Sequence, residues 1–232
     1  MADPYKITYS YTFKDGKTRA FTLALDRKDL ALIAEKPPAP PLWALLSLNK
    51  CGNCPLNEQT SIYCPVALNL SAIVEEFKNF ISHEKVSVAV AVEERTYFKE
   101  TTIQQGLSPL LGIIMTTSGC PIMEQLKPMV RFHLPFASLE DTIFRMVSMY
   151  LMAQHLRHRD GKSAAWTLDG LAKVYAEVGR VNRDFAQRLR IAAQKDANVN
   201  ALVNLDCFAT MVPLAADETL NAIKPYFAAY LK

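Results

Sequence analysis

The strict alternation of apolar and polar side chains in the first part of the chain constrains the fold more than any other feature. Large apolar residues take every second position on both sides of a turn that ends at Gly16, which predicts a β-hairpin over residues 5–25 with one buried face. A three-residue loop at 14–16, with its glycine in the left-handed region, pairs Tyr9 with Phe21. A two-residue loop would place the apolar residues of the second strand on the opposite face, so the alternation argues against it.

Apolar periodicity also predicts the remaining elements. Residues 65–82 have the spacing of an amphipathic helix, and residues 86–92 alternate as a third strand. From about residue 101 the pattern is almost entirely helical, and the expected helices cover residues 138–159, 171–192, 197–211 and 216–231. The sequence therefore predicts an α+β fold, in which a small antiparallel sheet (the N-terminal β-hairpin plus a third strand) packs with helices and is followed by a mostly helical C-terminal half.

The length of the chain bears on its domain organisation. At 232 residues, half of them hydrophobic, it can bury roughly 70% of its unfolded surface, so it needs neither a metal nor a disulfide merely to have a core. We expect residues 1–232 to form one domain. The alternative is a subdivision into an α+β part at 1–100, which contains the cysteine segment, and a helical part at 101–232.

Charge and hydropathy favour a cytoplasmic protein. The net charge is only +3 and the basic residues are spread along the chain, whereas nucleic-acid-binding domains usually cluster them; we therefore do not expect a nucleic-acid partner. The N-terminus lacks the basic and apolar regions of a secretory signal. The most apolar helical segment, 143–153, is interrupted by Arg145, so we interpret it as a core helix and expect no membrane association.

Four cysteines form the most informative motif. Cys51 and Cys54 are spaced as C-x2-C, and Cys54, Cys64 and Cys120 are each followed by proline. Proline is favoured at the first position of a helix, so each Cys-Pro pair is expected to place its sulfur at a helix N-terminus. The partial positive charge there favours a thiolate, the form in which cysteine binds metal or reacts.

Several functions fit this motif. Four thiolates at Cys51, Cys54, Cys64 and Cys120 would complete a tetrahedral metal site. Structural zinc is our first choice, and the protein would then be non-enzymatic and act by binding a protein partner through its helical half. An iron–sulfur cluster for electron transfer or redox sensing is the alternative. A thiol–disulfide oxidoreductase using C-x2-C is the second alternative, and buried thiols without any such role also fit; enzymatic activity is left open.

The remaining reactive side chains have plainer interpretations. Cys207 lies in an apolar helical segment and is expected to be a small buried hydrophobe. His133 is either a further ligand near Cys120 or a hydrogen-bonded core residue. His155 and His158 lie one helical turn apart and could share a metal, although they also suit the end of a helix electrostatically. No P-loop, dinucleotide-binding or hydrolase motif occurs.

Overall fold

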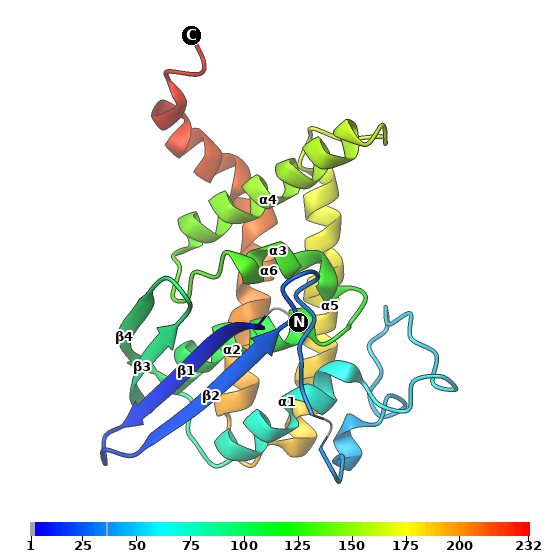
Figure 1. Ribbon diagram of the computed structural model, residues 1–232, viewed down its shortest axis with the longest axis vertical. Coiled ribbons are helices and arrows are strands. Elements are labelled where there is room, and N and C mark those ends of the chain that lie inside the picture. The colour runs from blue at the N-terminus through cyan, green and yellow to red at the C-terminus, as the bar shows by residue number, and fades with distance from the viewer. Residues whose placement is uncertain (1–2, 36) are drawn as a thin grey trace.

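The computed structural model describes residues 3–35 and 37–232, and within them a four-stranded antiparallel sheet packs against helices (Figure 1). The predicted α+β fold with a mostly helical C-terminal half is confirmed. The strands are β1 (Tyr5–Phe13), β2 (Thr18–Leu25), β3 (Lys85–Ala91) and β4 (Thr96–Thr102). The helices are α1 (Pro65–Phe77), α2 (Ile103–Thr117), α3 (Lys127–Arg131), α4 (Leu139–Arg159), α5 (Asp169–Ala192) and α6 (Ala197–Ile223), with 3₁₀ helices η1 (Leu42–Ala44), η2 (Met123–Leu126) and η3 (Lys224–Phe227).

The register of the β1–β2 hairpin is the predicted one. Tyr9 pairs with Phe21, and the backbone N–H of Phe13 donates to the carbonyl of Lys17 at 2.9 Å, which leaves a three-residue loop. Gly16 adopts the left-handed conformation with φ of 81°. The odd positions of β1 up to Tyr11 are buried, so strand periodicity was sufficient to predict which face packs on the core.

The sheet has the order β2-β1-β3-β4, so the predicted third strand does lie beside the hairpin. The fourth strand, β4, was not predicted. It is an edge strand in which only Thr101 is buried, and a strand with little buried surface does not need an alternating pattern. Its pairing with β3 is set by that neighbour and by the short turn between them.

The C-terminal helices agree with the sequence prediction except in one place. Ser138 and Asp141 form a complete capping box at the start of α4, as expected, and α4 ends at Arg159. Two short helices were predicted between residues 197 and 231, but α6 continues through Pro213 to Ile223. Proline removes one helical hydrogen bond, and packing of α6 on α2, α4 and α5 stabilises the continuous helix.

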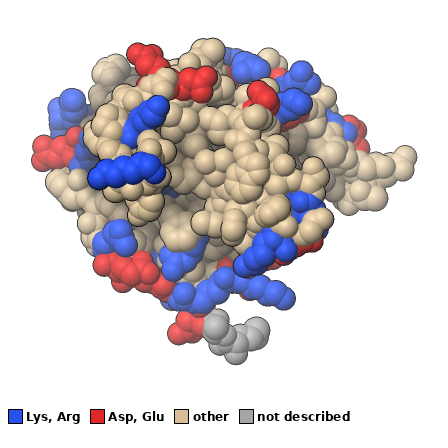
Figure 2. All heavy atoms as spheres, turned by 90° about the horizontal axis from the view of Figure 1, so that it is seen from above, with Lys and Arg blue, Asp and Glu red and all other residues tan. Residues whose placement is uncertain are grey.

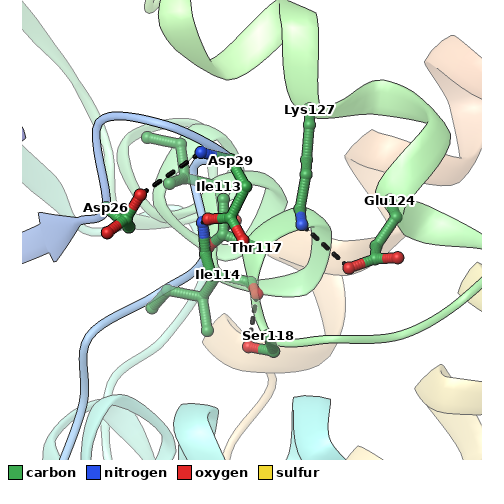
Figure 3. A network of polar contacts seen from close by, with 9 residues as sticks. Asp26, Asp29, Ile113, Ile114, Thr117, Ser118, Glu124 and Lys127 are labelled. Carbon is green, nitrogen blue, oxygen red and sulfur yellow. Dashed lines mark hydrogen bonds and ion pairs between the residues drawn. The ribbon is translucent and has the colours of Figure 1, made fainter.

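The end of α2 is a junction between the hairpin and the later helices (Figure 3). The hydroxyl of Thr117 donates to the carbonyl of Ile113, and that of Ser118 donates to Ile114. The backbone N–H of Leu32 donates to the carbonyl of Thr117 at 2.9 Å. The chain after β2 is therefore held against the helix that precedes Cys120. One hydrophobic core cluster includes residues of the sheet and of the C-terminal helices.

Candidate functional site

The four motif cysteines lie in three different parts of the fold. Cys51 and Cys54 bracket a turn closed by a 3.0 Å hydrogen bond from the N–H of Cys54 to the carbonyl of Cys51. Cys64 is the N-cap of α1, and Cys120 follows α2. Their thiols are near enough to influence one another, because Cys64, Cys54 and Cys120 each contribute to raising the pKa of Cys51. All are free thiols and are partly buried.

The predicted metal site at Cys51, Cys54, Cys64 and Cys120 is wrong. Across residues 3–35 and 37–232, no group of three or more Cys, His, Asp or Glu side chains is arranged to hold a metal ion. Both the zinc hypothesis and the iron–sulfur alternative fail on this geometry. The C-x2-C oxidoreductase alternative gains no support either, because the structure has no disulfide between Cys51 and Cys54.

The electrostatic premise of that prediction also fails. Burial is the largest influence on the pKa of Cys51, Cys64 and Cys120, and it raises that of Cys51 to about 12. Burial likewise raises the pKa of Cys64, and hydrogen bonds from the N–H groups of Ala67 and Val66 offset only part of the increase. Desolvation disfavours a charged thiolate. The N–H groups in the first turn of α1 stabilise the thiolate of Cys64 by less than desolvation destabilises it. Cys54 starts no helix, and Cys120 precedes only the 3₁₀ helix η2.

Polar side chains of α5 hold the cysteine segment in place. The carboxylate of Asp184 accepts a 2.8 Å hydrogen bond from the N–H of Gly52, and that of Glu177 accepts one of 2.7 Å from the Asn53 side chain. Arg188 donates to four backbone carbonyls in the segment just before Cys51, those of Trp43, Leu45, Leu46 and Asn49. The turn therefore has a structural anchor that requires no metal.

The other sequence candidates are dispersed. His155 and His158 are exposed near the end of α4, where the ring of His158 contacts Trp166 edge-on. Cys207 was expected to be buried but is exposed, because it lies on the outward face of α6 between Val203 and Met211, which are also exposed.

A largely apolar cavity of about 370 Å³ lies in the described part of the chain. Its lining residues come from β4, α2, the segment around α3, and α4 to α6. Most of its lining is apolar. The apolar side chains that surround it include Ile113, Met123, Met129, Val130, Phe136, Met146, Val178, Leu205 and Phe208.

A few polar side chains converge on this cavity. Asn182, on α5, is 2% exposed, and its Oδ1 has no hydrogen-bond partner among the described residues. Arg145, on α4, is half-buried, and burial lowers its pKa. Tyr175 lies beside them, with its pKa raised by burial. An apolar cavity with a small number of polar groups is the usual form of a small-molecule site.

His133 closes part of the cavity wall in its neutral form. Its Nε2 lies 2.6 Å from the hydroxyl oxygen of Tyr9, which is fully buried. Burial, with a smaller contribution from Arg145, lowers the pKa of His133 to about 3. Of the two roles expected for this histidine, the structure shows the hydrogen-bonded core residue.

This depressed pKa predicts a pH dependence of stability. Below about pH 6.5 the unfolded chain gains a proton on His133 that the folded chain does not, so folding stability decreases as the pH falls towards 3. The slope from this residue approaches about 1.4 kcal/mol per pH unit. Urea unfolding from about pH 7 to 4.5 should give a flatter profile for His133→Gln than for the wild type. His158→Gln, an exposed control, should keep the wild-type slope, and equal slopes for all three would contradict the assignment.

Comparison with known proteins places this fold in a family. A family model described as "Domain of unknown function (DUF6901)" matches residues 7–228. The chain belongs to this family. No curated protein and no solved structure matches it. The matched range of the DUF6901 domain contains every residue that lines the cavity.

Sequence reasoning missed this cavity, although the DUF6901 chain carries signs of it. Asn182 takes a core position of α5, four residues after Val178 and three before Phe185, both of which are buried. Arg145 interrupts the most apolar part of α4. A polar residue at a core position commonly marks either a buried hydrogen bond or a binding site. Among the described residues, Asn182 Oδ1 has no hydrogen-bond partner.

The end of α6 is the other unusual surface of the DUF6901 protein. Ala197–Phe227 is the one described helical segment long and apolar enough to cross a membrane, and a third of its most apolar window is buried. Its last turns point away from the rest of the fold (Figure 1). Figure 2 looks onto this end of the molecule, where charged side chains surround a central area without them. The exposed apolar residues here include Leu214, Tyr226, Phe227, Tyr230 and Leu231.

Proposed function

We propose that this DUF6901 protein binds a small, largely apolar molecule in the cavity between α2, α4, α5 and α6. The observation that carries the proposal is the cavity itself, whose volume of about 370 Å³ lies within the usual range for ligand sites, roughly 300–1,000 Å³. The unpartnered Oδ1 of Asn182 supports the same reading, because a bound ligand could satisfy it.

Filling the cavity tests this function. Ala209 is 5% exposed on α6 and lines the cavity, so Ala209→Phe should occupy ligand space and weaken binding about tenfold or more, equivalent to about 1.4 kcal/mol. Calorimetry or native mass spectrometry with decanoate, decanol and decyltrimethylammonium provides the measurement.

The matched control is Ala222→Phe, which makes the same change at an exposed position of α6. It should bind the probes as the wild type does, and circular dichroism should show both variants folded. Undiminished binding by a folded Ala209→Phe variant would place the ligand outside this cavity. Failure of the wild type to bind any of the three probes would count against the function itself.

A protein partner and a cytoplasmic location remain predictions from the sequence. If a partner binds the helical half, the exposed end of α6 and η3 is the surface with the most accessible apolar area, because Tyr226 is 77% exposed and Tyr230 is 88% exposed. Large exposed apolar patches often mark protein or membrane contacts.

A further inference from the structure

We infer that the ligand of this cavity is an anionic amphiphile, an apolar body that carries one carboxylate-like head group. The inference rests on the proposed function and adds the chemical class of the ligand. It depends on the charges around the cavity: Arg145 and Lys99 line it, and no aspartate or glutamate does so among the described residues.

Arg145 is a cation with unused donors. Its Nη2 donates to the carbonyls of Met129 at 2.9 Å and Phe132 at 2.6 Å, and these two bonds fix the direction of the guanidinium. None of the ion pairs between described residues includes it. An arginine side chain stays protonated and presents five N–H donors that match a carboxylate in a two-point contact. Asp141, one turn earlier on α4, is close enough to counteract part of the lowering of the Arg145 pKa, but it is not in an ion pair with Arg145. A half-buried guanidinium that forms no ion pair with the described residues and keeps free donors is therefore a suitable receptor for an anion.

Lys99 adds a second positive charge at the rim. It is exposed on β4, and its Nζ lies 5.8 Å from the ring centroid of Phe136, which also lines the cavity. The ion pairs between described residues do not include Lys99 either. His133 is held neutral by burial, so it contributes no charge. The lining thus carries two positive charges and no negative one.

The rest of the wall suits a flexible apolar body. Met123, Met129 and Met146 line the cavity, and methionine adapts its shape to irregular partners. Asn182 supplies a buried amide to the same wall. We therefore expect selection by head-group charge to be stronger than selection by the exact shape of the apolar part.

Three probes with the same alkyl chain test the head-group preference. Decanoate should bind the wild-type protein about tenfold or more tightly than decanol, because a hydrogen bond between two charged groups is stronger than one to a neutral hydroxyl. Decyltrimethylammonium should bind more weakly than decanol, since it meets two like charges. Isothermal calorimetry below the critical micelle concentrations gives the three affinities.

Variants locate the head group. Arg145→Gln should reduce the affinity for decanoate towards that for decanol and leave decanol binding unchanged. Lys99→Gln should have a smaller effect that disappears at high salt, because exposed charges are screened. Arg159→Gln is the matched control on α4, since Arg159 is exposed and does not line the cavity.

The possible outcomes separate the two proposals. If none of the probes binds, both the proposed function and this inference are wrong. If decanol or the ammonium probe binds as tightly as decanoate, the cavity binds ligands but the anionic class is wrong. A preference for decanoate that survives in both Arg145→Gln and Lys99→Gln would also overturn the inference. If Arg145→Gln fails to fold, the wild-type ranking and Lys99→Gln still decide it.

Discussion

Replacing Arg188 with methionine is expected to lower the free energy of unfolding by about 3–5 kcal/mol. Arg188 is 1% exposed, and its guanidinium donates to the carbonyls of Trp43 at 2.7 Å, Leu45 at 2.6 Å and Asn49 at 3.0 Å. Methionine preserves much of the alkyl packing but removes the donor to the part-buried carbonyls of Trp43 and Asn49, whereas the carbonyl of Leu45 keeps the N–H of Leu48 as a donor. Each unsatisfied buried carbonyl costs roughly 1–3 kcal/mol, and relaxation of the segment towards water recovers part of that cost.

Two measurements check this expectation. Urea unfolding monitored by circular dichroism gives the change in stability, and hydrogen exchange should show the largest loss of protection in residues 42–54. Arg190→Met is the control, because Arg190 is exposed on the same helix and should change stability by no more than about 0.5 kcal/mol. Arg188→Lys should lie between the two, since a compact ammonium cannot reach carbonyls spread over this segment. A loss below about 1 kcal/mol for Arg188→Met would show that the segment is held by other contacts.

The hydrogen bonds from α5 to the cysteine segment also show why the metal prediction failed. The sequence places three cysteines between residues 51 and 64, and the metal prediction interpreted them as ligands. The structure instead holds the segment with Glu177, Asp184 and Arg188, which are spaced seven and four residues apart and so share one face of α5. Hydrogen bonds to backbone groups depend on where the loop lies in space, so no spacing within the loop reveals them.

Local rules predicted the parts of the fold that depend on neighbouring residues. The hairpin register follows from a period of two and a three-residue loop, and the start of α4 follows from the Ser138 and Asp141 capping box. Predictions failed where tertiary packing overrides local preference. Two helices were expected at 197–211 and 216–231, but α6 is continuous and accommodates Pro213, and β4 forms by pairing with β3 despite its exposed surface.

The cavity could not be predicted from the sequence, for a geometric reason. Its walls come from β4 and from helices between residues 103 and 209, and a void exists only once their relative positions are known. Arg145 and Asn182 could have been marked as polar residues in apolar patterns. Nothing in their spacing, 37 positions apart by number, shows that α4 and α5 bring both to the same cavity.

Two glycines on α2 should respond in opposite directions to replacement by alanine. A Cβ at Gly106 would lie 2.8 Å from Val88 Cγ2 and 3.3 Å from Tyr11 Cε1, two fully buried side chains of the sheet. Gly106→Ala should therefore destabilise the fold by about 1–3 kcal/mol, the usual cost of overpacking a core, even though alanine favours a helix by roughly 0.5–1 kcal/mol over glycine.

Gly112→Ala provides the matched control, six positions further along the same helix. Its Cβ would meet Leu205 Cδ2 at 3.4 Å, an ordinary contact at the cavity wall. Only the higher helix propensity of alanine over glycine then affects stability, so this variant should be more stable than the wild type by roughly 0.5–1 kcal/mol. Thermal and urea unfolding of the two variants measure both effects. If both alanines stabilise the protein, the sheet must be able to move away from α2, and the close packing at Gly106 does not limit the fold. If Gly112→Ala destabilises it, the wall at Leu205 must be rigid, which would leave little freedom to accommodate ligands of different shape.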